Sequence, residues 1–375
     1  MFLHEKYNLT KVINAAGPFS PVGVSRSSEN VKKTVAAGLS DFFIINELQN
    51  EVDKALCKLT NAESGTITHC TASSITLSVA ATMTGCNQEN ILALPNINNM
   101  PNRVIIPTGH SINYGQSILQ AIRLSGAKPI LVGTEQQCTI NDIEKELYNK
   151  KTACLLLVSS RLTKGSLVDL FNAVEIAHHH NIPVIIDAAA QDMRINELLS
   201  TKANLILLSA QKYLASPTAG IVLGNKELVK AVRDQSSGIG RAMKATKESI
   251  CGVLAAIEDR ANTDRKEWII EQNEKVSYFL KSIRNLSGIT AKALPDSSGM
   301  PFSRVHLVID PIFLKIDAKE LAQELKSNTP SIWVIESLAV ENQLILELVS
   351  LKKEELIIIK TSLEEILKEK INKYN

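Results

Sequence analysis

The side chains best suited to chemistry are a carboxylate and an amine that each follow a short apolar run. Asp187 ends the run at 183–187, and Lys212 comes shortly after the run at 205–208. Both runs are rich in Ile, Val and Leu, which predicts strands buried on both faces of a mainly parallel sheet. Ligands bind outside the carboxyl ends of such strands, so we expect the acid and the amine to face one crevice.

An acid and an amine in one crevice have a specific chemical use. A pyridoxal ring needs an amine to hold its aldehyde and a carboxylate to keep its ring nitrogen protonated. A lysine in dry protein has a lowered pKa, which suits it to act as nucleophile and then as base. Taken singly, Asp187 could cap a loop and Lys212 could be a surface lysine. Because both follow predicted buried strands, the pair favours the cofactor interpretation.

The elements that position these residues alternate between strand-like and helix-like patterns. This alternation predicts an α/β three-layer domain with a mainly parallel sheet. The expected strands are 104–106, 129–132, 153–158, 184–186, 205–208 and 221–223. The expected helices are 72–84, 114–125, 140–149, 166–180 and 225–235.

The pattern changes after about residue 245, where a long helical stretch runs, with a break, to about residue 286. It is followed by strand-like runs and further helices, which predict a small α+β domain. The strands are expected at 304–309, 331–336 and 343–349, and the helices at 318–326 and 352–373. We therefore expect an N-terminal arm at 1–40, a large domain at 41–260 and a small domain at 261–375.

The composition limits the classes of partner. The 375 residues carry a formal net charge of +2, with acidic and basic residues interspersed. No strong basic field is available for a nucleic-acid backbone, so we do not expect a nucleic-acid partner. Six scattered cysteines without a CxxC pair predict free thiols in a reducing compartment. With no apolar run long enough for a signal peptide or a membrane span, we expect a cytoplasmic protein.

Four motifs make the chain similar to a known family. They are Val-Ile-Asn-Ala-Ala-Gly at 12–17, Ile-Asp-Ala-Ala-Ala-Gln at 186–191, Ser-Ala-Gln-Lys at 209–212 and Gly-Ile-Gly-Arg-Ala-Met-Lys at 238–244. The chain thus resembles the selenocysteine-synthase-like branch of the pyridoxal-phosphate (PLP) enzymes of fold type I. Within that branch it is most similar to the D-glucosaminate-6-phosphate ammonia-lyase group. The resemblance implies an aspartate-aminotransferase-like fold, bound pyridoxal 5'-phosphate and at least a homodimer, whose second subunit completes the active site.

The resemblance also implies roles for single residues around the cofactor. Lys212 would carry it as a Schiff base, and Asp187 would pair with the pyridinium nitrogen. Ala189 would press against one ring face, with Ser209 among the cofactor-binding residues. His110 follows another predicted strand and would stack across the ring, or would instead cap a helix.

The cofactor phosphate is expected at the start of the helix predicted at 72–84. Backbone N–H groups and the helix dipole favour an anion there. The residues concerned are Cys70, Thr71, Ala72 and Ser73. Relatives usually have a Ser-Gly-Ala sequence at this loop, so Cys70 replaces a glycine and costs backbone freedom. Ala210-Gln211 stands where relatives tend to have two glycines, and both departures bear on substrate choice.

Basic residues near the glycine-rich motif are candidates for substrate binding. Arg241 and Lys244 would meet an anionic group of the substrate, or would form a salt bridge with a neighbouring subunit. Arg26 is a further candidate for the same task. The histidines at 178–180 end a helical pattern, where imidazoles complement the helix dipole, so we expect no metal site.

The implied activity is that of a PLP-dependent lyase of the ammonia-lyase type. Its substrate would be a small anionic amino acid with a β-hydroxyl group, namely a phosphorylated amino-sugar acid. Lys212 would remove the α-proton, and either His110 or Lys212 would protonate the leaving hydroxyl. One alternative is a selenocysteine-synthase-like transfer of selenium or sulfur onto seryl-tRNA, which the short arm and near-neutral charge disfavour. Another is a catalytically degenerate relative, for which Cys70 and Gln211 are the motive.

Overall fold

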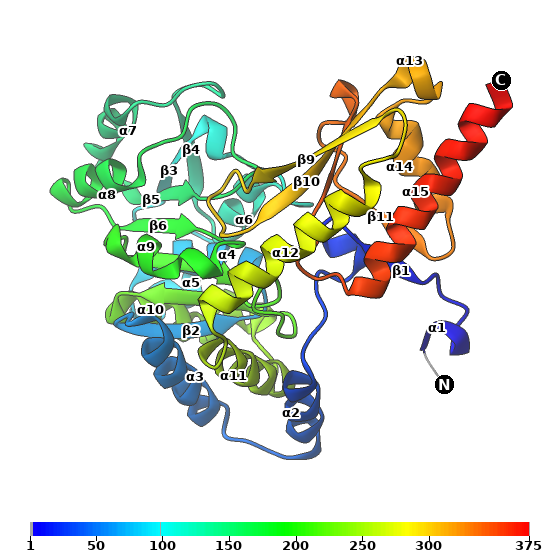
Figure 1. Ribbon diagram of the computed structural model, residues 1–375. Helices are drawn as coiled ribbons and strands as arrows, with labels where there is room; N and C mark the ends of the chain where they lie inside the picture. The colour runs from blue at the N-terminus through cyan, green and yellow to red at the C-terminus, as the bar shows by residue number, and fades with distance from the viewer. Residues whose placement is uncertain (1–2, 98, 375) are drawn as a thin grey trace. The chain divides into compact units, whose positions relative to one another are not determined.

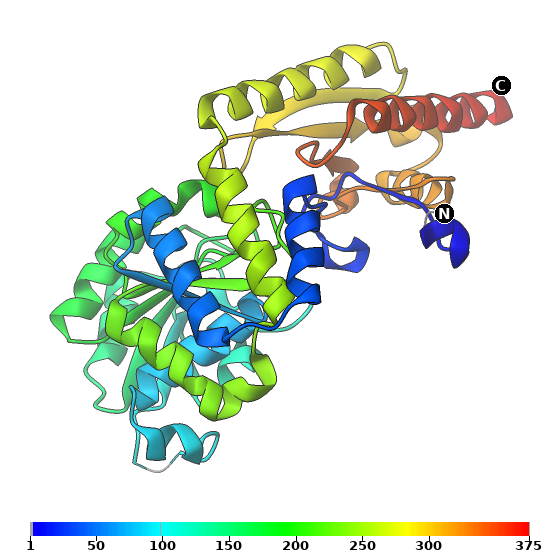
Figure 2. The same cartoon turned by 90° about the horizontal axis from the view of Figure 1, so that it is seen from below.

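The computed structural model describes residues 3–97 and 99–374, and the chain divides into two compact units (Figure 1). The larger unit comprises residues 27–262, and the smaller one combines residues 1–26 with residues 263–375. The division differs from the arm expected at 1–40, because helix α2 (Glu29–Ser40) belongs to the larger unit. α2 lies beside α11 (Lys247–Ala261), and Ser28 Oγ donates to Asp259 Oδ2 at 2.5 Å (Figure 2).

The larger unit is built on a seven-stranded sheet with the order β2-β8-β7-β6-β5-β3-β4. Of these strands only β8 runs antiparallel to its neighbours, so the prediction of a mainly parallel sheet is confirmed. The strands are β2 (Ser64–Thr68), β3 (Arg103–Pro107), β4 (Lys128–Val132), β5 (Thr152–Val158), β6 (Val184–Asp187), β7 (Leu205–Ser209) and β8 (Gly220–Gly224).

Helices cover both faces of this sheet, because successive side chains of a strand point to opposite faces. On β5, Leu155 and Leu157 join one apolar core, whereas Cys154 and Leu156 join the other. The first core is covered by α3 (Ile45–Thr60), α7 (Ile140–Leu147), α8 (Leu170–His179), α9 (Ile195–Ser200) and α11. The second is covered by α4 (Thr71–Thr84), α6 (Ile118–Leu124) and α10 (Lys226–Asp234), and α5 (Gln88–Ala93) follows α4.

The smaller unit has its own core, in which Phe279 and Leu307 are fully buried. A three-stranded antiparallel sheet in the order β12-β10-β9 and a parallel pair of β1 with β11 form its framework. The strands are β1 (Val12–Asn14), β9 (Ile289–Pro295), β10 (Ser303–Ile309), β11 (Ser331–Trp333) and β12 (Gln343–Leu346). The helices are α1 (Leu3–Lys6), α12 (Arg265–Ile283), α13 (Pro311–Leu314), α14 (Ala318–Ser327) and α15 (Lys353–Tyr374).

The sequence pattern did not reveal three strands, β1, β2 and β9, and the helices expected at 114–125 and 166–180 begin later than predicted. β1 has only three residues. β2 reads Ser-Gly-Thr-Ile-Thr and β9 reads Ile-Thr-Ala-Lys-Ala-Leu-Pro, so neither has the continuous apolar run of a strand buried on both faces. The helix expected at 114–125 begins only at Ile118, because a turn closed by Asn113 and Ser117 precedes it.

None of the helices within residues 3–97 and 99–374 has both the length and the apolar character needed to cross a membrane.

Candidate active site

The structure brings Asp187 and Lys212 together at the carboxyl ends of neighbouring parallel strands. Asp187 is the last residue of β6 and pairs in register with Leu207 of β7. β7 ends at Ser209, and Lys212 follows in the loop that leads to β8. The charge on Lys212 is close enough to lower the pKa of Asp187. Asp187 and Lys212 therefore lie at one edge of the sheet, as expected from the two apolar runs.

The carboxylate of Asp187 is held in dry surroundings. The residue is 3% exposed, and its Oδ1 accepts a hydrogen bond from the Ala189 N–H at 3.1 Å. Burial raises the pKa of Asp187 to about 6, against the opposing effects of the Lys212 charge and the Ala189 amide. A buried carboxylate of this kind gains free energy from a nearby cationic group.

His110 lies next to the same strand end. It closes the short helix η2 (Thr108–His110) after β3, and its Nδ1 accepts a hydrogen bond from the Val158 N–H at 3.0 Å. Val158 in turn pairs in register with Asp187. His110 therefore bonds to a strand amide and does not cap a helix. Burial lowers the pKa of His110 to about 4, so its ring is neutral near pH 7, with the proton on Nε2.

The N-terminus of α4 offers amide groups to an anion. Its N-cap, Cys70, makes no capping hydrogen bond with its side chain, and Cys70 Sγ instead lies 3.3 Å from Ser73 Oγ. The first amide to bond within the helix is that of Ser74, to Cys70 O at 2.9 Å. The amides of Thr71, Ala72 and Ser73 precede it, as at any helix start, and suit a phosphate.

This helix start lies against the strand ends that carry Lys212. Thr71 Oγ1 donates to Leu208 O of β7 at 3.4 Å. At the beginning of β8, a Cβ on Gly220 would come within 2.5 Å of Cys70 O, so the close approach requires glycine at that position. The amine, the buried carboxylate and the helix start therefore form one site.

Tyr114 also belongs to this site, although the sequence analysis missed it. Its hydroxyl oxygen is buried, and no hydrogen-bond partner for it lies within residues 3–97 and 99–374. Burial and the nearby charges of Asp187 and Cys70 raise the pKa of Tyr114. The sequence pattern placed Tyr114 in the helix predicted at 114–125, so the tyrosine was not recognised as a site residue.

Arg241 and Lys244 lie beside the loop that leads to Cys70. They are exposed and line a pocket of about 560 Å³ that also includes Phe42 and Phe43. Between them, Met243 O accepts a hydrogen bond from the His69 N–H at 2.9 Å. The glycine-rich motif is thereby held against the strand that precedes the α4 N-terminus.

Arg26 lies in the smaller unit and is engaged in a structural contact there. Its Nη2 forms an ion pair with Glu355 Oε2 at 2.7 Å and donates to Ser350 O at 2.7 Å. The structure thus places Arg26 in a different unit from Lys212.

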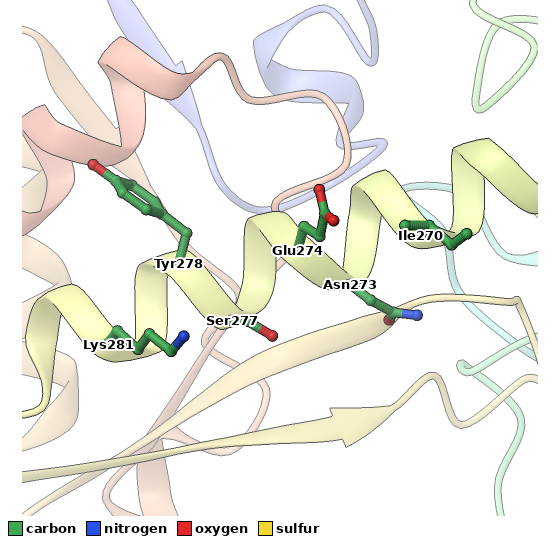
Figure 3. Close-up of a pocket in the computed structure, with 6 residues that line it drawn as sticks. All are labelled: Ile270, Asn273, Glu274, Ser277, Tyr278 and Lys281. Carbon is green, nitrogen blue, oxygen red and sulfur yellow. The ribbon is translucent and has the colours of Figure 1, made fainter.

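Lys212, Asp187, His110, Tyr114 and the N-terminus of α4 are together called the strand-end site. Two other features of the chain differ from it. His178 Nε2 lies 2.9 Å from Asn204 Oδ1 and His180 Nε2 lies 3.3 Å from Glu144 Oε1, so these imidazoles have separate partners. A surface hollow of about 420 Å³ runs along one helix, α12, between Ile270 and Lys281 (Figure 3). It contains none of the residues expected to do chemistry.

The residues of the strand-end site fit pyridoxal phosphate. Lys212 offers the amine, Asp187 a buried carboxylate for a ring cation, and His110 a neutral ring beside it. The α4 N-terminus offers amides to the phosphate, and the Tyr114 hydroxyl is a buried donor that needs an acceptor.

Comparisons with known proteins agree with this geometry. The family model described as L-seryl-tRNA selenium transferase matches residues 46–302. The chain is 29% identical over 334 residues to the D-glucosaminate-6-phosphate ammonia lyase of Salmonella typhimurium, covering 88% of each chain. It is also 29% identical over 336 residues to a 5'-C-glycyluridine monooxygenase-decarboxylase of a Streptomyces species, covering 88% of this chain and 83% of that one.

Solved structures match over nearly the whole chain. A structure of D-glucosaminate-6-phosphate ammonia-lyase superposes with a TM-score of 0.88 at 26% identity, covering 98% of this chain and 99% of that one. The aspartate aminotransferase of Thermotoga maritima, at 13% identity and a TM-score of 0.57, covers 97% of this chain and 94% of its own, and shows the fold alone. The predicted aspartate-aminotransferase-like fold is confirmed.

Proposed function

The chain belongs to the L-seryl-tRNA selenium transferase family, and we propose that it is a PLP-dependent lyase. Its reaction is an α,β-elimination that releases ammonia from a hydroxylated, phosphorylated amino-sugar acid. The similarity to D-glucosaminate-6-phosphate ammonia lyase, in sequence and in structure, supports this substrate class. The observation that carries the proposal is that Asp187 and Lys212 follow neighbouring strand ends, with the carboxylate of Asp187 buried.

The proposal assigns a chemical role to each residue of the site. When bound, pyridoxal 5'-phosphate supplies an aldehyde for amine exchange and a ring that accepts electrons. Lys212 holds the aldehyde until the substrate amine replaces it, and then removes the α-proton as general base. Asp187 would stay ionised and hold a proton on the ring nitrogen, Ala189 and His110 would pack against the ring, and Ser209 would contact the cofactor.

Lys212, and not His110, delivers the proton to the leaving hydroxyl. The hydrogen bond from the Val158 N–H occupies Nδ1 of His110, and burial lowers its pKa to about 4. A neutral imidazole is a weak acid near pH 7, whereas Lys212 has just accepted the α-proton. The C–O bond to the β-hydroxyl breaks, water forms, and hydrolysis of the released product gives a keto acid and ammonia. No oxidant or reductant is required.

The anionic groups have two binding regions. The α4 N-terminus, with Cys70, Thr71, Ala72 and Ser73, would hold the cofactor phosphate. Arg241 and Lys244 bind an anionic group of the substrate, or serve an interface between subunits. Their exposure beside the pocket that contains Phe42 supports both uses.

The protein works as a homodimer or larger homo-oligomer, in a reducing compartment such as the cytoplasm. Exposed apolar side chains at 42–45, close to Arg241 in the same pocket, support an interface there. All six cysteines are free, which supports the reducing compartment.

Ammonia release measured across phosphorylated amino-sugar acids and their unphosphorylated counterparts tests the function. The proposal expects turnover of a phosphorylated substrate by the wild type and none by Lys212→Ala. The family model itself favours a second candidate, selenium transfer onto seryl-tRNA. Conversion of seryl-tRNA without ammonia release from any sugar acid would select that candidate. A protein that takes up no pyridoxal phosphate would point to a degenerate relative.

A further inference from the structure

The hydroxyl of Tyr114 has no partner among the described residues although its oxygen is buried. A buried donor without an acceptor costs about 1–3 kcal/mol, so such a group in a binding site indicates that a ligand supplies the acceptor. Burial and neighbouring negative charge raise the pKa of Tyr114, which keeps the hydroxyl protonated. The missing partner is therefore a hydrogen-bond acceptor.

The loop that carries Tyr114 is tied down by its own backbone. The Tyr114 N–H donates to Gln116 O at 3.1 Å, and the Ile118 N–H donates to Ile112 O at 3.0 Å. The Gly115 N–H donates to Asn113 Oδ1 at 2.9 Å. The position of the phenol is thus set by a closed turn at the entrance to α6.

Packing places Tyr114 beside the site, because its side chain lies against the apolar core that contains Ile75 of α4 and Val158, the residue paired with Asp187. The charges that act on Tyr114 are those of Asp187, at the end of β6, and Cys70, the N-cap of α4. In the proposed function, Asp187 would hold the ring nitrogen of the cofactor and the α4 N-terminus would hold its phosphate. In pyridoxal phosphate, the ring nitrogen and the carbon that bears the phosphate arm are separated by a single ring carbon. A group near both partners faces that edge.

We propose that Tyr114 binds the phosphate of pyridoxal 5'-phosphate, donating its hydroxyl hydrogen to a phosphate oxygen. The inference rests on the cofactor assignment in the proposed function. Tyr114 supplies a further side-chain donor at the helix start, where the Thr71 hydroxyl already donates to Leu208 O and the Cys70 thiol is a weak donor. The Asp187 carboxylate is the alternative acceptor, and the two acceptors predict different results for cofactors with and without a phosphate.

The test compares the binding of pyridoxal 5'-phosphate and of pyridoxal to apoprotein, for wild type and Tyr114→Phe. Dissociation constants are measured by absorbance titration, and the ³¹P resonance of the bound phosphate is recorded. A lost hydrogen bond to a charged group predicts about 10- to 100-fold weaker binding of the phosphorylated cofactor. Binding of pyridoxal should stay within about twofold, and the ³¹P resonance should shift.

Tyr148→Phe is the matched control, because Tyr148 is 69% exposed and lies at the end of α7. It should bind both forms of the cofactor like the wild type. An equal loss of affinity for both forms in Tyr114→Phe would overturn the inference and assign the hydroxyl to Asp187. An unchanged affinity for both would also overturn it. If wild-type apoprotein bound neither form, the proposed function itself would fail.

Discussion

Two regions of the molecule bury charged side chains, and they differ in how fully the buried charge is paired. In the smaller unit, Arg304 is buried between the carboxylates of Asp296 and Glu347. In the larger unit, Asp187 is equally buried, but burial raises its pKa to about 6, and the nearby Tyr114 hydroxyl has no partner in the described part of the chain.

Several interactions hold the buried guanidinium of Arg304, and together with Asp296 and Glu347 it forms the Arg304 cluster. Both Nε and Nη2 donate to Glu347 Oε2, at 2.9 and 2.6 Å, while Nη1 bonds to Asp296. The guanidinium also lies 5.0 Å from the centre of the Phe302 ring. Asp296 Oδ1 in turn accepts the amide of Ser298 at 2.9 Å. With its donors engaged, the cluster stabilises one packing of this unit.

The difference separates a structural charge cluster from a binding site. Where a buried group is fully paired, removing it should damage stability. Where a buried group is held at a free-energy cost, removing it should damage binding and improve the stability of the apoprotein. Variants of Lys212, Arg304 and Asp187 test the two halves of this contrast.

The largest effect is expected for Lys212→Ala. Loss of the amine removes both the attachment of the cofactor and the general base, so ammonia release should fall by about 10³-fold or more. The matched control is Lys164→Ala, because Lys164 also follows a strand but forms an exposed ion pair with Glu135 at 2.5 Å. Steady-state assays of both variants check this, and equal losses in the two would contradict the assignment.

Next, Arg304→Met should destabilise the protein by about 3–5 kcal/mol, because it leaves two buried carboxylates without their cation. The control in the same unit is Arg26→Met, whose ion pair is half-exposed and should be worth only about 0–1 kcal/mol. Urea unfolding of both variants gives the comparison. If Arg304→Met were as stable as Arg26→Met, the structural role of the cluster would be wrong.

Asp187→Asn should act in the opposite sense on stability. The pKa of Asp187 is about 6 in the folded protein and about 3.9 unfolded, so the folded state binds the additional proton between these values. Stability contributed by this group therefore decreases as pH rises from about 4 to about 6, by about 1–3 kcal/mol. The variant removes this cost.

Apoprotein of Asp187→Asn should thus be more stable than the wild type at pH 8 and similar near pH 4. At the same time it should bind pyridoxal phosphate more weakly, since the ring nitrogen loses its counter-ion. Thermal unfolding of both apoproteins at several pH values measures the first effect. If Asp187→Asn were less stable than the wild type at pH 8, the carboxylate of Asp187 would be fully paired in the apoprotein, like the guanidinium of Arg304.

The last prediction concerns His110, which has the opposite pH dependence and acts only on acidification. Its pKa is about 4 in the folded protein and about 6.5 unfolded, so the unfolded state binds the additional proton between these values. Stability contributed by His110 is present above about pH 6.5 and decreases as pH falls toward 4. His110→Asn keeps an acceptor for the Val158 N–H but removes this titration. Relative to wild type, its apoprotein should gain stability on acidification, and parallel pH profiles would refute this.

The parts of the fold that could be predicted from the sequence are those whose pattern is local. β5 and β6 read as continuous apolar runs because both their faces are covered by helices. Asp187 and Lys212 were found because they follow such runs directly. β2 could not be found this way, since its fit depends on Gly65, where a Cβ would meet Leu56 and Leu223.

The parts that could not be predicted depend on contacts between distant segments. Arg26 was a candidate for the substrate, but its ion-pair partner, Glu355, lies near the other end of the chain. Tyr114 belongs to the site because a turn places it near Cys70 and Asp187, and helical periodicity does not reveal such a turn. Contacts between distant segments do not produce a periodic pattern in the sequence.

The central claim is that Lys212 and Asp187 hold one pyridoxal phosphate between them. Borohydride reduction of the purified protein with added cofactor, followed by mass spectrometry of its peptides, tests this most directly. The account predicts that the reduced cofactor is attached to Lys212 in wild type, and that Asp187→Asn lowers its occupancy. Attachment at Lys164, or no modified peptide at saturating cofactor, would contradict it.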